Sequence, residues 1–230
     1  MALILNIETS ENICSVALSK NGELIAVKES SEERQHAKLL GVFIEELLKE
    51  TNTDIKELDA VAVTKGPGSY TGLRIGVSTA KGICFGIDKN LIAIDTLESM
   101  AYVASEKYKN EADLLLCPMI DARRMEVYTR LYDSSLTPVS EIEAKVLDEN
   151  SYDEILKEKK ILFFGSGMPK FKEILNNENA IFDEEIMPSA KNIISLSEQR
   201  FNDKKFEDVA YFEPYYLKDF IAIKPKNKVF

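Results

Sequence analysis

The sequence predicts an α/β protein made of two similar domains, and two observations support this fold class. Short apolar runs typical of β-strands alternate with amphipathic segments typical of helices along the 230 residues. The order strand-strand-strand-helix-strand-helix occurs twice, with a period of about half the chain. Because a chain of this length can form two small domains, we expect one domain over residues 1–108 and a second over 109–230.

The first half contains three strands followed by alternating helices and strands. The second and third strands are joined by Asn21-Gly22, which is a strong signal for a β-hairpin. Ser30 or Ser31 is the expected cap of the first helix. The expected strands cover residues 3–7, 14–19, 23–28, 58–64 and 91–94, and the expected helices cover 32–50, 71–86 and 96–107. This order of elements is that of the ribonuclease-H-like fold.

The second half repeats this plan with shorter elements. Pro118 interrupts its first strand, so we expect that strand to be bent or to lie at a sheet edge. The expected strands cover residues 114–120, 125–132, 142–147 and 161–164, and the expected helices cover 152–159, 169–176 and 193–202. Two facing domains of this kind make up the actin-like ATPases and sugar kinases, which hold ATP in the cleft between their halves.

Composition and charge exclude several classes of function. The net charge of −10 argues against broad binding of nucleic acid by phosphate neutralisation. The lysines of residues 218–230 could form a local basic patch, but a solvated tail is the simpler interpretation. No apolar run approaches the length of a membrane span, and the chain does not begin like a signal peptide. Cys14, Cys84 and Cys117 lie in apolar surroundings, as reduced core cysteines of a cytoplasmic protein do.

The segment 65–76, KGPGSYTGLRIG, is the most distinctive in the chain. Gly66, Pro67 and Gly68 are expected to turn the chain sharply, because glycine adopts φ > 0 without steric cost and proline presets φ. Ser69 is expected to cap the helix that follows. A glycine-rich turn before a helix can hold a phosphate, but this one matches neither the P-loop nor the dinucleotide pattern. Both interpretations stay open, and we favour the structural turn.

Two helices have more small or apolar surface than one buried side requires. Gly72, Gly76 and Ala80 recur every fourth residue and therefore share one face of their helix. Because glycine costs about 1 kcal/mol relative to alanine in a helix, this stripe indicates close packing, either on the domain's own sheet or on a partner. Helix 32–50 is apolar on two sides, so it is either enclosed within the monomer or exposed to a partner. Such surfaces on neighbouring helices predict a helical interface between two subunits.

Residues that could bind Mg²⁺ and a nucleotide occur near both expected hairpins. Glu8, followed by Thr9 and Ser10, ends the first strand, where a kinase or ATPase of this fold needs a carboxylate for Mg²⁺. Asp121 supplies a carboxylate at the second hairpin, but no glycine-rich phosphate loop accompanies it. A small-molecule kinase or ATPase is therefore the alternative function.

Two further signals for chemistry are weak. Gly165 and Gly167 could approach a nucleotide, although an ordinary turn between strand and helix explains them better. His36 is the only histidine, so a metal site built on two histidines cannot form. The sequence therefore predicts no complete catalytic site, no metal site and no cofactor.

Four segments spread over nearly the whole chain resemble one known family. GPGSYTGLRIG at 66–76 is similar to its GPGSFTGLRIG signature, and NIETSENICSVAL at 6–18 is similar to its first strand and hairpin. Glu8 stands where many members have aspartate. DARRMEVY at 121–128 resembles its DAR-x-x-E-V-Y hairpin, with methionine where glycine is usual, and PYYLK at 214–218 resembles its P-x-Y-L-R, with lysine for arginine. By these motifs the chain is identified as a member of the TsaB family, also called YeaZ.

The resemblance implies the duplicated actin-like fold and a non-catalytic scaffold subunit of tRNA threonylcarbamoyladenosine synthesis. Members pair with TsaD, the enzyme that transfers threonylcarbamoyl to N6 of an adenosine in tRNA, and a small ATPase, TsaE, joins them. Alone, members often form homodimers through the same surface. We therefore expect TsaD and TsaE as partners, a homodimer when the chain is alone, contact with tRNA mostly through the complex, and no contact with a membrane. The expected partner interface consists of His36, Leu39, Leu40, Val42, Phe43, Tyr70, Gly72, Leu73, Arg74, Gly76, Val77 and Ala80.

Overall fold

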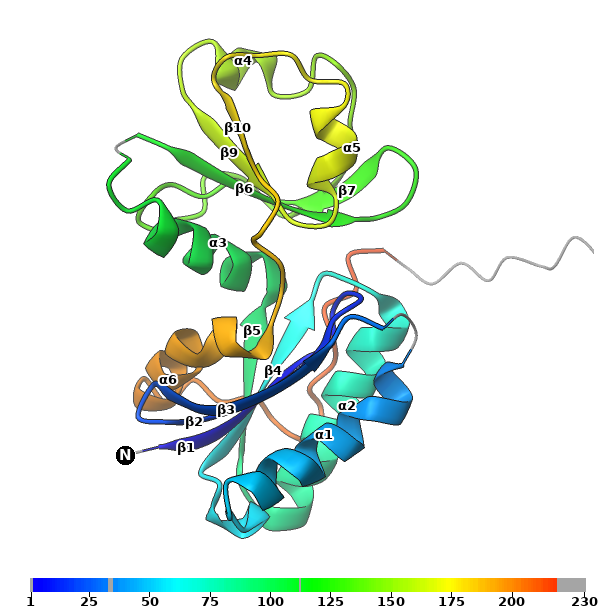
Figure 1. Ribbon diagram of the computed structural model, residues 1–230, viewed down its shortest axis with the longest axis vertical. Helices are drawn as coiled ribbons and strands as arrows, with labels where there is room; N and C mark the ends of the chain where they lie inside the picture. Colours follow the sequence, from blue (N-terminus) through cyan, green and yellow to red (C-terminus); the bar gives the residue numbers. More distant parts are fainter. Residues whose placement is uncertain (1, 33–34, 112, 219–230) are drawn as a thin grey trace, which may run out of the picture.

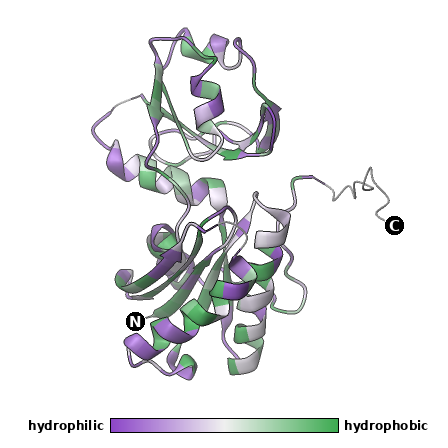
Figure 2. Cartoon of the chain, turned by 45° about the vertical axis from the view of Figure 1, so that its right-hand side comes forward, coloured by the Kyte–Doolittle hydropathy of each residue, from purple (hydrophilic) through white to green (hydrophobic). Residues whose placement is uncertain are grey.

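The computed structural model describes residues 2–32, 35–111 and 113–218, and it shows two α/β domains (Figure 1). Each domain is built on a five-stranded mixed sheet, and helix α3 (Thr96–Lys107) connects the two sheets. Figure 2 shows hydrophobic residues concentrated on the strands and on the helix sides that face them. The duplicated fold that the order of elements predicts is confirmed.

The first sheet has the strand order β3-β2-β1-β4-β5. Strand β2 is antiparallel to both of its neighbours, whereas β1, β4 and β5 are parallel to one another. Asn21 and Gly22 turn the chain between β2 and β3 with φ angles of 55° and 78°, as a tight hairpin requires. The strands are β1 (Leu3–Glu8), β2 (Cys14–Lys20), β3 (Glu23–Ser30), β4 (Ala60–Gly66) and β5 (Asn90–Asp95).

The second sheet repeats the first, with the strand order β10-β9-β6-β7-β8. Strand β7 is antiparallel to both neighbours, whereas β6, β9 and β10 are parallel. The strands are β6 (Leu115–Asp121), β7 (Glu126–Thr129), β8 (Glu143–Val146), β9 (Ile161–Phe164) and β10 (Ala180–Asp183). The last of these strands is not among those that the sequence predicts.

Of the two alternatives for the strand that Pro118 interrupts, bent or at a sheet edge, the edge is wrong, because β6 is the central strand of the second sheet. The β6–β7 ladder has a gap between the Leu116–Tyr132 bridge and the Met119–Thr129 pair, and Pro118 lies in that gap. The missing N–H of proline therefore costs no ladder bond there. The carbonyl oxygen of Pro118 still accepts a hydrogen bond from Thr129 Oγ1 at 2.8 Å.

Helices of very different length cover the two sheets. The long helices α1 (His36–Glu50) and α2 (Tyr70–Ile87) cover one face of the first sheet (Figure 1). At the same places in the second domain stand the short helices α4 (Asp153–Leu156) and α5 (Met168–Lys172). The remaining elements are η1 (Ile55–Glu57), η2 (Ala190–Ile193) and α6 (Ile194–Asn202). Within the described residues, no helix is long and apolar enough to cross a membrane.

Helix α1 begins later than the sequence predicts, and its predicted cap is wrong. The first helical residue is His36, and Gln35 at the N-cap position makes no capping bond with its side chain. The hydroxyl of Ser30 accepts a hydrogen bond from the amide of Glu32 at 3.2 Å, so it closes a turn after β3 instead. Residues 33–34 of the predicted helix lie outside the described residues.

The last helix of each half packs on the sheet of the other half. Helix α3 follows β5, but its Leu97 and Met100 lie in a core with strands of the second sheet. Helix α6 follows β10, but its Leu196 packs with Ile4 and other residues of the first sheet. The predicted second domain, residues 109–230, therefore loses α6 to the first domain. An apolar helix face alone does not tell which of two sheets it covers.

Candidate functional site

The glycine-rich turn joins β4 to α2 and packs against the β1–β2 turn. Gly66 has a φ of 112°, a backbone region that favours glycine. Gly68 is needed for a different reason, since a Cβ there would overlap the carbonyl oxygen of Ser10. The same oxygen accepts a hydrogen bond from the amide of Ser69 at 2.6 Å. Ser69 caps α2 as predicted, because its hydroxyl accepts from the amide of Gly72 at 3.3 Å. These contacts support the structural interpretation of the turn.

The stripe of small residues on α2 faces the chain's own first domain. A Cβ at Gly72 or Gly76 would overlap atoms of Thr9, at the carbonyl oxygen and the hydroxyl respectively. The Thr9 hydroxyl donates a hydrogen bond to the carbonyl oxygen of Gly72 at 2.8 Å. Ala80 is fully buried in the first core. Of the two interpretations of the stripe, packing within the domain accounts for all three small residues.

Most residues of the predicted partner interface are covered by their own domain. Val42, which is 45% exposed, and Arg74 are the exposed members of the set. The half-buried members are Leu39, Phe43 and Tyr70, and the buried members are His36, Leu40, Gly72, Leu73, Gly76, Val77 and Ala80. An interface on these two helices stays a prediction, and burial restricts it to their outward side.

The outward side of these helices has a second set of small and apolar residues that the sequence reasoning missed. Phe85 is 85% exposed, beside the exposed glycines Gly82 and Gly86. Among the described residues, a Cβ at Gly41, Gly82 or Gly86 would meet no atom from outside its own stretch of helix within 4 Å. The spacing of Gly82 and Gly86, four residues apart on a separate side of α2, was the available signal. We call Gly41, Val42, Gly82, Phe85 and Gly86 the outer face.

A cleft of about 1480 Å³ separates the two domains. Its walls come from residues 10–13 after β1, 68–71 at the start of α2, 120–126 around the β6–β7 turn, Ser166 after β9, and 216–218. Two predicted site residues, Ser10 and Asp121, therefore line the same cleft from different domains. We call this space the interdomain cleft.

Glu8, the predicted Mg²⁺ ligand, is not among the described residues that line the interdomain cleft. It is fully buried, as is Thr9. The amide of Ser10 donates to its Oε1 at 2.5 Å, and the hydroxyls of Ser10 and Thr64 lie beside the carboxyl group. Burial raises the pKa of Glu8, and the hydrogen bond from the Ser10 amide, together with the nearby hydroxyls, opposes the rise. The structure therefore does not bring Glu8 and Asp121 together as a metal-binding pair.

The two predicted glycines after β9 serve close packing. Gly165 has a φ of 92°, and a Cβ there would lie 2.5 Å from the carbonyl oxygen of Met119. A Cβ at Gly167 would lie 2.6 Å from a methyl carbon of Val127. Both glycines thus hold the β9–α5 turn against β6 and β7, which agrees with the ordinary turn favoured from the sequence.

In the segment that begins at Glu8, the carboxyl group that reaches the interdomain cleft is that of Glu11. The sequence reasoning missed this residue. Burial raises the pKa of Glu11 to about 8, and the nearby carboxylates of Glu8 and Asp121 add to the rise. The hydroxyl of Ser166 donates a hydrogen bond to Glu11 Oε1, which opposes it and joins the two domains. Asp121 accepts from Lys170 Nζ at 2.5 Å. Both carboxyl groups are therefore engaged with other side chains.

The described part of the chain offers no metal-binding cluster. No group of three or more His, Cys, Asp or Glu side chains there is arranged to hold a metal ion. The three cysteines, Cys14, Cys84 and Cys117, are free thiols and buried, and burial raises the pKa of each to about 11.

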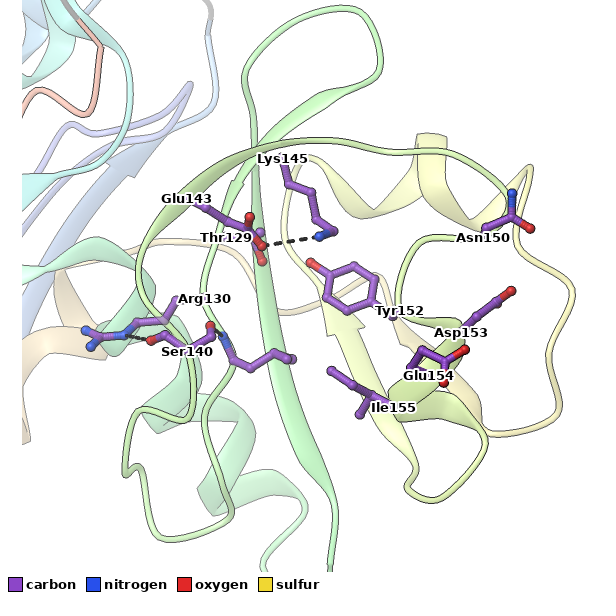
Figure 3. A pocket seen from close by; sticks show the side chains of 11 residues that line it. Thr129, Arg130, Ser140, Glu143, Lys145, Asn150, Tyr152, Asp153, Glu154 and Ile155 are labelled. Carbon is purple, nitrogen blue, oxygen red and sulfur yellow. Dashed lines mark hydrogen bonds and ion pairs between the residues drawn. The ribbon is translucent and has the colours of Figure 1, made fainter.

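A smaller cavity of about 290 Å³ lies in the second domain beside β7 and β8 (Figure 3). The ammonium group of Lys145 lies 4.9 Å from the ring centroid of Tyr152 and 3.4 Å from Glu143 Oε1. The thiol of Cys117 donates to the hydroxyl of Tyr152 at 3.6 Å. Because these side chains pair with one another, we assign this cavity no chemistry.

Sequence comparisons identify the relatives of this chain. The family model described as TsaD, tRNA N6-adenosine threonylcarbamoyltransferase, matches residues 24–225. The chain is 30% identical over 227 residues to the tRNA threonylcarbamoyladenosine biosynthesis protein TsaB of Escherichia coli, with 96% of each chain covered. It is 32% identical over 180 residues to the protein of the same name from Bacillus subtilis, covering 76% of this chain and 75% of that one.

Solved structures agree on the fold. YeaZ from Pseudomonas aeruginosa superposes with a TM-score of 0.79 at 24% identity, over 94% of this chain and 100% of that chain. The activator of 2-hydroxyisocaproyl-CoA dehydratase from Clostridium difficile, with bound ADPNP, superposes with a TM-score of 0.50 at 10% identity, over 88% of this chain and 96% of that one. Both likenesses concern the fold alone. The sequence matches show that the chain belongs to the TsaB family.

Proposed function

We propose that this chain is a non-catalytic subunit of tRNA threonylcarbamoyladenosine synthesis, which pairs with TsaD and holds it in its active conformation. The relatives at 30% and 32% identity carry the name of that biosynthesis. The observation that carries the proposal is the outer face of α1 and α2, which the described part of the chain leaves uncovered.

The outer face has the chemistry of a close helix-helix contact. Each glycine inside a helix costs about 1 kcal/mol relative to alanine. Gly41, Gly82 and Gly86 have open space beside them, so close packing within the monomer does not offset that cost. Helices of a partner could approach these glycines closely and bury Phe85, and full burial of such a side chain contributes about 1.5–3 kcal/mol.

A partner with a related first domain fits this face best. The family model described as TsaD matches residues 24–225 of this chain, so TsaD has helices that correspond to α1 and α2. Two related faces can pair about a pseudo-twofold axis, and two copies of this chain can pair in the same way. We therefore propose the heterodimer with TsaD, joined by TsaE, and a homodimer when the chain is alone.

The state of the carboxyl groups supports a non-catalytic role. Glu8 is buried and is not among the described residues that line the interdomain cleft, and Asp121 pairs with Lys170. A kinase or ATPase of this fold needs free carboxylates at these places to hold Mg²⁺. The alternative function therefore has less support than the scaffold.

The test is a tRNA modification assay with purified TsaD and TsaE from the same organism. The mixture also contains the enzyme that forms the threonylcarbamoyl adenylate, with threonine, bicarbonate and ATP. We expect modified tRNA when this chain is added and at most a trace without it. Equal modification in both mixtures would refute the proposal, and turnover of Mg-ATP by the chain alone would support the kinase alternative.

A matched pair of variants locates the interface. Val42→Asp places a charge on the outer face, and Val139→Asp places the same charge on a valine of similar exposure, 45% against 50%, in the second domain. Desolvating a charge in an interface is costly, so Val42→Asp should reduce co-purification with TsaD and tRNA modification at least about tenfold. Val139→Asp should leave both unchanged. Equal effects of the two variants would remove the outer face from the proposal.

A further inference from the structure

The β6–β7 turn has an unusual backbone. Arg123 and Arg124 are consecutive, and their φ angles are 73° and 51°. Residues other than glycine rarely adopt this left-handed region, and two in a row are rarer still. The turn is fixed by its neighbours, since Asp121 Oδ1 accepts from the amide of Arg123 at 2.9 Å and the amide of Glu126 donates to the carbonyl of Arg123 at 3.1 Å. Strain of this kind at a fixed turn points to a function for the side chains it presents.

The two arginine side chains have no partner among the described residues. Both are exposed and both line the interdomain cleft. The nearby lysines differ, because Lys170 pairs with Asp121 at 2.5 Å and Lys218 pairs with Glu126 at 2.5 Å. Each acidic side chain on this wall is therefore already matched by a lysine, and the guanidinium groups remain available.

The charge balance of the interdomain cleft is positive, in contrast to the protein as a whole. Asp121 with Lys170 and Glu126 with Lys218 each sum to zero. Glu11, on the opposite wall, accepts a hydrogen bond from Ser166, and burial favours its neutral form. The two arginines therefore leave the cleft with positive charge, whereas the whole chain carries −10. This balance suits an anionic ligand, and guanidinium groups match phosphate geometry in particular.

Two aromatic side chains also line the interdomain cleft. The rings of Tyr70 and Tyr216 lie with their centroids 4.7 Å apart, and both residues line the cleft. Tyr216 is 36% exposed. Aromatic rings beside cationic side chains are the usual means by which proteins bind single-stranded nucleic acid. The volume of about 1480 Å³ also exceeds the roughly 300–1,000 Å³ of most small-molecule pockets.

We propose that the interdomain cleft binds a single-stranded segment of RNA. Arg123 and Arg124 contact backbone phosphates, and the Tyr70–Tyr216 pair provides the ring on which a base stacks. The inference rests on the proposed function, in which the RNA is the tRNA that the complex modifies. It extends that function because it gives this chain a direct contact with the substrate.

The first experiment measures tRNA binding by the complex of this chain with TsaD, using fluorescence anisotropy over a range of salt concentrations. The test variant is Arg123→Ala/Arg124→Ala. The control is Lys159→Ala/Lys160→Ala, since these two consecutive exposed cations precede β9 at the opposite end of the second sheet. We expect the arginine variant to bind about tenfold more weakly, and its plot of log K against log salt to become shallower by about 0.7 for each phosphate that is no longer neutralised. The lysine variant should behave like the original chain.

Other readouts separate this inference from the proposed function. Co-purification with TsaD should be the same for both double variants, because neither touches the outer face. Arg123→Lys/Arg124→Lys, which keeps the charge, should restore part of the affinity. Unchanged tRNA affinity and salt dependence in the alanine variant would overturn the RNA site while leaving the scaffold intact.

A third arm uses the full chain alone with a labelled single-stranded oligoribonucleotide and, separately, with ATP. Arginine-dependent binding of the oligoribonucleotide supports the inference even if pairing with TsaD fails. Arginine-dependent binding of ATP with no binding of the oligoribonucleotide would overturn it in favour of a mononucleotide site.

Discussion

The two domains share one sheet topology but differ greatly in their helices. The connections after β3 and β4 hold helices of 15 and 18 residues, whereas those after β8 and β9 hold helices of 4 and 5 residues. The order and direction of the strands are the same in both sheets. The two domains therefore share the topology of the sheet, and the long helices are an addition that occurs only in the first domain. That addition also carries the outer face.

The second domain fills its core in a different way. Its short helices α4 and α5 contribute little apolar surface to the core, and large aromatic side chains take their place. Phe163 lies within 5.1 to 5.6 Å, between ring centroids, of Tyr152, Phe171 and Phe182. In the first domain the same role falls to aliphatic residues of α1 and α2. We expect the two domains to respond differently to mutation.

The largest effect is expected at the centre of the aromatic cluster. Phe163→Ala should lower the free energy of unfolding by about 3–5 kcal/mol, because it leaves a cavity where four rings meet. The control is Tyr211→Ala, which removes an 85% exposed ring outside the outer face and should change stability by less than about 0.5 kcal/mol. Differential scanning calorimetry measures both. A loss for Phe163→Ala no larger than for the control would mean that the rings do not replace the missing helices.

The second effect concerns the close contact between α2 and the β1–β2 turn in the first domain. Gly72→Ala should destabilise the protein by about 1–3 kcal/mol, because the new Cβ would overlap the carbonyl oxygen of Thr9, which is backbone. Ser78→Ala, on the exposed side of the same helix, is the control and should be nearly neutral. Urea unfolding provides the measurement. If Gly72→Ala is as stable as Ser78→Ala, the contact with Thr9 does not hold the helix in place.

The third effect is a pH dependence located between the domains. The pKa of Glu11 is raised to about 8 in the folded protein, against 4.5 ordinarily. Between these values the folded protein holds a proton that the unfolded chain has lost, so the free energy of unfolding falls as pH rises from about 5 to 8. Glu11→Gln removes this loss and should gain about 1.4 kcal/mol relative to the original chain for each pH unit within that window. Thermal unfolding at pH 5 and pH 8 measures the gain, and a difference that does not change with pH would contradict the assignment.

The smallest effect is expected on the outer face, where the mutation should raise the free energy of unfolding rather than lower it. Gly82→Ala should stabilise the isolated monomer by about 0.5–1 kcal/mol, since alanine favours the helix and its Cβ meets nothing within 4 Å. The same methyl group should weaken pairing with TsaD, which needs close approach. Helix stability is read from thermal unfolding and pairing from titration calorimetry. A variant that is more stable and pairs equally well would show that this glycine is not part of the interface.

Strands and their order were predictable from the sequence, and the exceptions have physical causes. Two elements match their predicted ranges, the strand Ile161–Phe164 and the helix Thr96–Lys107. An apolar run marks the ends of the strand, and a capping residue marks the start of the helix. Ala180–Asp183 was missed because it is a four-residue edge strand with an acidic flank. Pro118 misled the prediction because a gap in a ladder is a tertiary feature. Helices α4 and α5 are shorter than predicted, because the helix propensities of the residues in the predicted ranges do not show where each helix ends.

The candidate sites were less predictable than the fold. Ser10 and Asp121, which the sequence reasoning grouped at one possible nucleotide site, both line the interdomain cleft, and the nucleotide site itself stays a prediction. The sequence reasoning chose Glu8 over Glu11, since which carboxyl group reaches a cleft depends on how a turn folds back. The predicted partner interface includes Gly72, Gly76 and Ala80, which pack within their own domain, because periodicity identifies a face but not what covers it. Only the packing of Thr9 resolves that question.

The exchange of α3 and α6 between the domains has a consequence for synthesis on the ribosome. The sheet face formed by Ile4, Ala62 and Ile94 is covered by Leu196 and its neighbours. The second domain lies between them in the chain, so the first sheet emerges long before its cover exists. The first domain is therefore completed only after the second domain has been synthesised, and a truncation before α6 would leave the first sheet with one apolar face exposed to water.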